Sequence, residues 1–148
     1  MKARDVMTHP VVTVLTSTTL AEAAQLMSTH GFTALPVVDD DGRLVGIVTE
    51  ADLIKDRMPP DPRRQYWRTR HSPSASAAVE RVMTTPVESL TPGADTADAV
   101  QIMLRQHIRC LPIVDGQQLV GIVTRRDLMR SAFSVADPVV LRTSAGQA

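Results

Sequence analysis

The apolar positions of the chain first predict a short strand and then a helix. Residues 10–14 form an extended run rich in β-branched side chains, which is typical of a strand. The next apolar positions recur at i, i+3, i+4 and i+7, the spacing of one helix face: Leu20, Ala23, Ala24 and Met27. We expect this helix to end near Gly31.

Two further apolar runs follow, joined by a short acidic segment. Residues 35–38 and 44–48 flank Asp39-Asp-Asp-Gly42, and this arrangement is typical of a β-hairpin. A second helix is expected to open at Thr49 and to run through Ile54. The predicted order is therefore β-α-β-β-α.

The same pattern occurs a second time. Residues 6–39 laid over residues 82–115 match at 13 of 34 positions, and residues 44–53 laid over 119–128 match at 8 of 10. Two copies of one supersecondary unit therefore fill most of the chain.

A sheet of three strands with helices on one face cannot cover its own apolar surface at this size. We therefore predict an α/β fold in which the two tandem β-α-β-β-α repeats pack as a pseudo-twofold pair, with a small-molecule cleft between them. The predicted divisions are repeat 1 at 1–56, a basic linker at 57–81, repeat 2 at 82–133 and a C-terminal tail at 134–148.

Composition limits the classes of partner. The chain has 148 residues, 43% of them hydrophobic, and its 16 basic and 16 acidic residues cancel, so no global field favours nucleic acid or an anionic membrane. Cys110 is the only cysteine, which argues against a disulfide framework, and we expect it to be a buried, inert thiol. No signal peptide or membrane span is recognisable, so we expect a cytoplasmic protein.

The linker differs from the rest in charge and composition. It carries six arginines against two acidic residues, together with four prolines and the aromatic residues Tyr66 and Trp67. It either lies along the acidic first repeat or is solvated, or else Arg63, Arg64 and Arg68 contact phosphate or nucleic acid. Val135 to Leu141 in the tail would add a strand or pack on a neighbour.

The most informative motif is Gly-Ile-Val-Thr-x-x-Asp, at residues 46–52 and 121–127. In each copy a strand ends, a hydroxyl residue follows, and an aspartate stands in the first turn of the next helix. The hydroxyl and the free helix N–H groups can hold a phosphate, while the carboxylate accepts hydrogen bonds from a ribose diol. The alternative is a helix cap that needs no ligand, because Thr-x-x-Asp is close to a capping box.

Together these motifs resemble the repeat of the CBS family, named after cystathionine β-synthase. The resemblance rests on Val-Met-Thr-x-Pro, the Ala-rich helix, Leu-Pro-Val-Val-Asp and Gly-Ile-Val-Thr-x-x-Asp, over about residues 3–56 and 79–131. It implies a Bateman module that commonly dimerises and binds AMP, ADP, ATP, S-adenosylmethionine or a related ligand between its motifs.

The resemblance also implies two unequal sites. The first has Asp127 at the ribose and Thr124 at the phosphate, and it is lined further by Thr18, Thr33, Ala34, Arg109, Arg125 and Arg126. The second has Thr49, Asp52, Asp95 and Cys110. Arginines match phosphate oxygens, whereas Asp95 adds negative charge, so we expect the Asp127 site to bind anionic nucleotides better.

Catalytic motifs are missing from the sequence. There is no Gly-rich phosphate loop, no Gly-x-Ser-x-Gly and no His-Glu-x-x-His, and the four histidines lack metal-ligand spacing. We therefore expect a regulatory sensor, not an enzyme, that needs no cofactor or metal. An adenosine ligand would act on a homodimer and, through it, on an effector protein that the sequence does not identify. The alternatives are a nucleic-acid-associated protein and a ligand-free dimerisation scaffold.

Overall fold

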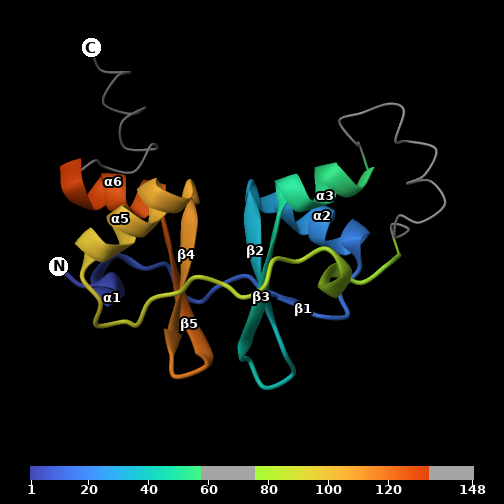
Figure 1. The fold of residues 1–148 in the computed structure, drawn as a ribbon, viewed down its shortest axis with the longest axis horizontal. Coiled ribbons are helices and arrows are strands. Elements are labelled where there is room, and N and C mark those ends of the chain that lie inside the picture. Colours follow the sequence, from blue (N-terminus) through green and yellow to red (C-terminus); the bar gives the residue numbers. More distant parts are fainter. Residues whose placement is uncertain (58–75, 134–148) are drawn as a thin grey trace, which may run out of the picture. The chain divides into compact units, whose positions relative to one another are not determined.

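The structure is a computed structural model that describes residues 1–57 and 76–133 (Figure 1). The predictions made for most of the basic linker, and for the C-terminal tail, lie outside the described residues. The fold is mixed α/β and contains both predicted repeats.

The first repeat has the predicted β-α-β-β-α order. Its three strands form one sheet in the order β1-β2-β3, with β1 parallel and β3 antiparallel to β2. Its elements are β1 (Val14–Leu15), α2 (Leu20–His30), β2 (Ala34–Val38), β3 (Leu44–Thr49) and α3 (Glu50–Arg57).

The second repeat departs from that order at its first strand. Its elements are α5 (Thr96–Gln106), β4 (Cys110–Asp115), β5 (Gln118–Thr124) and α6 (Arg125–Phe133). Where β1 would recur, the structure has a single parallel bridge between Leu90 and Ile113. Pro92 follows two residues later and has no backbone N–H to donate, so the ladder cannot continue through it.

The structure divides into two compact units. In each unit, the segment that precedes one repeat in the sequence groups with the other repeat. Unit 1 joins Met1–Pro10 to Ser89–Ile113 and to the described residues from Val120 onward, whereas unit 2 joins Val11–Glu88 to Val114–Leu119. The short helix α1 (Ala3–Val6) therefore belongs with the second repeat. The division of the sequence into repeats at 1–56 and 82–133 stays a prediction about sequence units.

Each of these preceding segments contributes a buried residue to the apolar core of the unit that it joins. In unit 2, Val79 of the 3₁₀ turn η2 (Val79–Arg81) is fully buried among residues of the first repeat, and in unit 1 Ala3 of α1 is fully buried among residues of the second. The unit 2 core contains Val14, Leu20, Ala23, Met27, Leu35, Val37, Val48 and Val79. The unit 1 core contains Ala3, Ala99, Met103, Leu111, Ile113 and Val123.

The acidic hairpin turn forms as predicted. Asp39 Oδ1 accepts hydrogen bonds from the backbone N–H groups of Asp41 and Arg43, both at 2.9 Å. Gly42 has φ +79°, a left-handed conformation that a side chain would strain. Local side-chain chemistry therefore fixes the register of this hairpin.

The helices α2 and α5 end in the same left-handed conformation but on different residues. Gly31 caps α2 at φ 70°, ψ 28°, and His107 caps α5 at φ 56°, ψ 33°. A side chain at this position costs about 1 kcal/mol, which glycine does not incur.

We expect His107→Gly to raise the free energy of unfolding by about 1 kcal/mol in urea titrations, and Gly31→Ala to lower it by a similar amount. A decrease in His107→Gly would show that the imidazole contributes more than the strain costs.

Candidate functional site

Both Thr-x-x-Asp elements form reciprocal caps at the start of a helix. In unit 2 the Thr49 N–H donates to Asp52 Oδ2 at 2.9 Å, and the Asp52 N–H donates to Thr49 Oγ1 at 3.1 Å. In unit 1 the Thr124 N–H donates to Asp127 Oδ2 at 2.8 Å, and the Asp127 N–H donates to Thr124 Oγ1 at 3.2 Å. The capping alternative is therefore correct as a description of both helix starts.

Asp127 has further contacts with hydroxyl groups. The Thr124 hydroxyl donates to Asp127 Oδ2 at 2.9 Å, so the backbone and the side chain of one residue both occupy that oxygen. The Thr8 hydroxyl lies 3.4 Å from Asp127 Oδ1, a long and weak hydrogen bond. Oδ1 therefore remains the oxygen that can accept a ligand hydroxyl.

Thr8 is a site residue that the sequence reasoning missed. It reaches α6 because the backbones of Thr8 and Ile122 form two hydrogen bonds, at 2.8 and 3.1 Å. Thr84 and Ile47 form the matching bridge in unit 2. The available signal was the repeated Val-Met-Thr, which places Thr8 and Thr84 at equivalent positions of the two repeats.

Arg109 and Arg125 lie together at the start of α6. The Arg125 N–H donates to the Arg109 carbonyl at 3.1 Å, which joins the residue before β4 to the residue after β5. The Arg125 guanidinium donates to the carbonyls of Ile108 at 3.2 Å and Met103 at 3.5 Å. The Arg125 guanidinium thus binds the carbonyl of Ile108 just after α5 and makes a longer contact with the carbonyl of Met103 in the last turn of α5. The side chains of Arg109 and Arg126 are exposed.

The start of α3 in unit 2 has the same backbone hydrogen bond as the start of α6, but Thr33 and Glu50 stand in place of Arg109 and Arg125. The Glu50 N–H donates to the Thr33 carbonyl at 2.9 Å, and Ala34 pairs with Thr49 in the sheet. Thr33 and Ala34 therefore lie beside the start of α3. Thr18 lies in the turn before α2, where its hydroxyl accepts a hydrogen bond from the Leu15 N–H at 2.9 Å.

The residues predicted for each site come from both units. Of the residues predicted around the first site, unit 1 contains Arg109, Thr124, Arg125, Arg126 and Asp127, and unit 2 contains Thr18, Thr33 and Ala34. Of those around the second, unit 2 contains Thr49 and Asp52, and unit 1 contains Asp95 and Cys110. Within each unit the residues at the helix start are brought together, and their joint use on one ligand stays a prediction.

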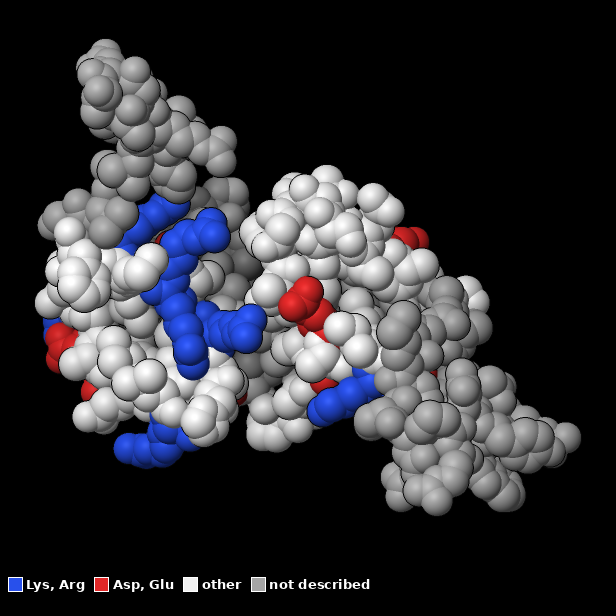
Figure 2. All heavy atoms as spheres, turned by 90° about the horizontal axis from the view of Figure 1, so that it is seen from above, with Lys and Arg blue, Asp and Glu red and all other residues white. Residues whose placement is uncertain are grey.

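Charge distinguishes the two helix starts. Arg125 and Arg126 open α6, whereas Glu50 and Ala51 open α3. Figure 2 shows basic side chains gathered on the helical side of unit 1. An anion at the start of α6 would meet both the helix dipole and guanidinium groups, whereas at α3 it would meet a carboxylate.

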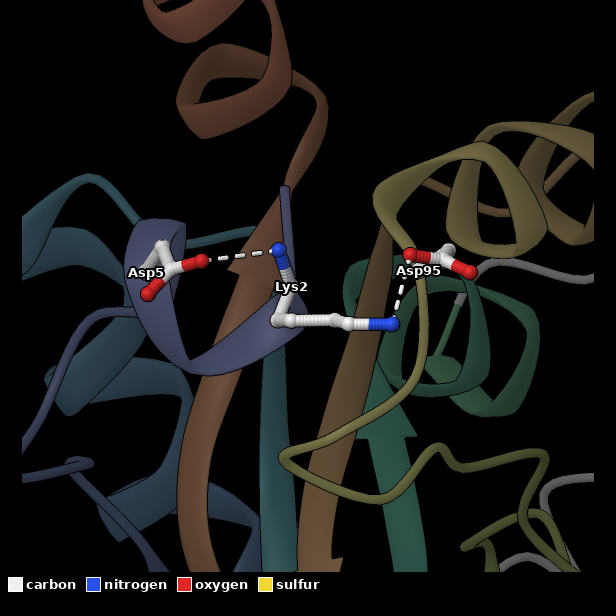
Figure 3. A network of polar contacts seen from close by, with 3 residues as sticks. All are labelled: Lys2, Asp5 and Asp95. Carbon is white, nitrogen blue, oxygen red and sulfur yellow. Dashed lines mark hydrogen bonds and ion pairs between the residues drawn. The ribbon is translucent and has the colours of Figure 1, made fainter.

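The negative charge expected at Asp95 is already paired. Figure 3 shows Lys2 between two carboxylates: its Nζ lies 2.9 Å from Asp95 Oδ1, and its backbone N–H donates to Asp5 Oδ2 at 2.8 Å. The hydrogen bond from Lys2, followed by the charge of Lys2, lowers the pKa of Asp95. The negative charge of Asp95 is therefore balanced by the ammonium group of Lys2 and is not an isolated charge.

Cys110 is half-buried, and burial raises the pKa of its thiol to about 11. At pH 8 only about one thiol in a thousand is then ionised, and the thiolate is the reactive form. We expect alkylation by iodoacetamide at pH 8 to be at least about 100-fold slower in the folded protein than in guanidinium chloride. Equal rates in the two states would contradict the inert assignment of Cys110.

Two negative observations concern only residues 1–57 and 76–133. Within that part of the chain, no three His, Cys, Asp or Glu side chains are grouped so as to hold a metal ion. In the same described part, none of the helices has both the length and the apolar character needed to cross a membrane.

The chain belongs to the CBS domain family. The family model matches it twice, at residues 3–58 and 79–134, which together form most of its length. This confirms the family resemblance and the two repeats that the sequence pattern predicted.

The similar proteins differ in how much of their length the chain spans. It is 38% identical to the CBS domain-containing protein YhcV of Bacillus subtilis over 88% of this chain and 85% of that protein. It is 34% identical to protein MJ1404 of Methanocaldococcus jannaschii over 87% of this chain but only 31% of that protein. It also matches 23% of the inosine-5'-monophosphate dehydrogenase of the same organism, at 32% identity over 87% of this chain.

Solved structures show the same fold with adenosine compounds bound. The structure of CBSX2 in complex with AMP superimposes with a TM-score of 0.77 at 29% identity, covering 90% of this chain and 96% of that one. The CBS domain pair of protein MJ0100, in complex with 5'-methylthioadenosine and S-adenosyl-L-methionine, gives a TM-score of 0.74 at 27% identity, covering 90% and 97%.

Proposed function

We propose that this protein is a regulatory sensor of an adenosine-containing ligand. The observation that carries the proposal is the start of α6, where Asp127, Thr124 and Arg109 lie together and Asp127 keeps one carboxylate oxygen for a ligand. Similar proteins with AMP or S-adenosylmethionine bound support the ligand class.

Asp127 Oδ1 would accept hydrogen bonds from a ribose diol, and Thr124 with the first N–H groups of α6 would meet a phosphate. Arg109 and Arg126 would pair with phosphate oxygens, since both side chains are exposed. Arg125 would contribute its positive charge near the start of α6, because its guanidinium already donates to the carbonyls of Ile108 and Met103. From the family resemblance, Thr18, Thr33 and Ala34 would contact the same ligand.

The Asp52 site would take a less charged adenosine compound or remain empty. Glu50 stands where Arg125 stands in the other repeat, and a carboxylate repels phosphate. Asp52 would bind the ribose hydroxyls of this site, Thr49 would contact a phosphate, and Asp95 and Cys110 would complete the site.

Binding would act through a homodimer on an effector protein, in the cytoplasm, and the chain would perform no catalysis. The dehydrogenase that the chain matches in part is consistent with this, because the match spans less than a quarter of the enzyme. No cofactor would be required beyond the regulatory ligand.

Thermal unfolding of the full chain with millimolar AMP, ADP, ATP or S-adenosylmethionine tests the proposal. A ligand at about 100 times its dissociation constant adds about 2.7 kcal/mol, or about 5 to 10 °C at this size. We expect ADP or ATP to give the larger shift. No shift with any of the four would favour the second candidate, a ligand-free dimerisation scaffold, which the reciprocal caps of Thr49 and Thr124 independently support.

A further inference from the structure

Arg125 binds two consecutive peptide units of the segment that leads from α5 into β4. Its backbone N–H donates to the Arg109 carbonyl at 3.1 Å, and its Nε–H donates to the Ile108 carbonyl at 3.2 Å. A terminal guanidinium nitrogen makes the longer contact, 3.5 Å, with the Met103 carbonyl. One residue at the start of α6 therefore fixes the backbone on which the Arg109 side chain stands.

The segment before β4 is a turn that benefits from this support. It begins at His107, whose φ of 56° is a left-handed conformation that costs energy for a residue with a side chain. The Ile108 N–H donates to the Met103 carbonyl at 3.2 Å, and Arg109 follows with an exposed side chain. Because an arginine side chain has many rotamers, a fixed backbone limits the positions that its guanidinium can reach.

The two arginines differ in what their guanidinium groups can still donate. The Nε of Arg125 carries a single hydrogen, and that hydrogen already points to the Ile108 carbonyl. A bidentate pair with a phosphate through Nε would break this bond. Since the Arg109 side chain is exposed, Arg109 is the better placed of the two to form such a pair.

Unit 2 keeps the backbone part of this arrangement and lacks the side-chain part. The Phe32 N–H donates to the Met27 carbonyl at 3.0 Å. The Glu50 N–H donates to the Thr33 carbonyl at 2.9 Å. An ionised carboxylate has no hydrogen to donate, so Glu50 cannot hold a carbonyl as Arg125 does. The arginine that donates and the arginine that it supports are both present in unit 1, and both are replaced in unit 2.

We propose that Arg125 is a positioning residue: it fixes the backbone of Arg109, and Arg109 makes the Asp127 site prefer phosphate-bearing adenosine ligands to adenosine itself. This inference rests on the proposed function and deepens it, because it names the residues that select the ligand class. Arg109 would meet the phosphate, whereas Arg125 would act through Arg109.

Calorimetric titration of the full chain with ADP and with adenosine tests the proposal. Arg125→Lys keeps the positive charge but puts a methylene group where the Nε–H that donates to Ile108 stands. We expect this variant to weaken ADP binding about 10-fold and adenosine binding less than about 2-fold, since only the phosphate contact is misplaced. In an Arg109→Gln background, Arg125→Lys should change neither dissociation constant further. Arg130→Lys makes the same change at an exposed position of α6 outside the predicted site and serves as the control.

Hydrogen exchange without ligand measures the support of the turn separately. We expect Arg125→Lys to speed exchange of the Ile108 amide about 5-fold, because the turn opens more often, and Arg130→Lys to leave it unchanged. Unchanged exchange in Arg125→Lys would overturn the proposal whatever the ligand does.

Two binding results would also overturn it. If Arg125→Lys weakens ADP binding equally with and without Arg109, Arg125 meets the phosphate directly. If Arg125→Lys binds ADP as tightly as the wild type, Arg125 contributes only its charge. Both results leave the proposed function intact, whereas a wild type that binds neither ADP nor adenosine would overturn this inference and the proposed function together.

Discussion

Gly121→Val is expected to lower the free energy of unfolding by about 3 kcal/mol. A Cβ on Gly121 would lie 2.9 Å from Met7 Cγ and 3.1 Å from Met7 Cβ, and closer still to the sulfur. The clash reaches Met7 Cβ, next to the backbone, so rotation of the flexible end of that side chain does not relieve it. Overpacking of this kind costs about 1 to 3 kcal/mol, and valine adds two carbons beyond the first. Urea unfolding measures the change.

Gly93→Val is the matched control. A Cβ on Gly93 has no atom within 4 Å, so we expect a change within about 0.5 kcal/mol. Adding Met7→Ala to Gly121→Val should recover part of the loss, because it removes the atoms that the valine meets. A double variant no more stable than Gly121→Val alone would show that the N-terminal segment does not pack on β5 in this way.

Asp127→Asn is expected to remove at least half of the stabilisation that an adenine nucleotide gives the wild type. An amide can still accept the Thr124 N–H, so the cap is largely kept, but it cannot accept both hydroxyls of a ribose diol. Losing a hydrogen bond to a charged group costs about 1.5 to 3 kcal/mol, comparable with the roughly 2.7 kcal/mol gained at 100 times the dissociation constant. Thermal shift with ADP, referred to each variant's own ligand-free midpoint, measures it.

Asp52→Asn makes the same chemical change in the same kind of cap on α3. If the Asp127 site holds the nucleotide, this control keeps the wild-type shift with ADP. Equal losses in the two variants would mean that both helix starts bind the ligand, and an unchanged shift in Asp127→Asn would remove Asp127 from the ribose position.

The sequence by itself determined the features that depend on local chemistry. Apolar spacing located α2 and its equivalent α5, Asp39 with Gly42 located the hairpin turn, and Thr-x-x-Asp marked both helix starts. These features involve residues a few positions apart, so their energies can be read from spacing and residue type.

Tertiary structure alone decided which distant segments meet. The exchange of the N-terminal segment into unit 1 brings Thr8 to Asp127 and Lys2 to Asp95, contacts that span 119 and 93 residues. The tertiary structure also decided that the Arg125 guanidinium donates to the Ile108 carbonyl, 17 residues away in the sequence. Such contacts depend on how the apolar surfaces of separate segments are buried together. The spacing of residues within one segment does not identify the segment against which it packs.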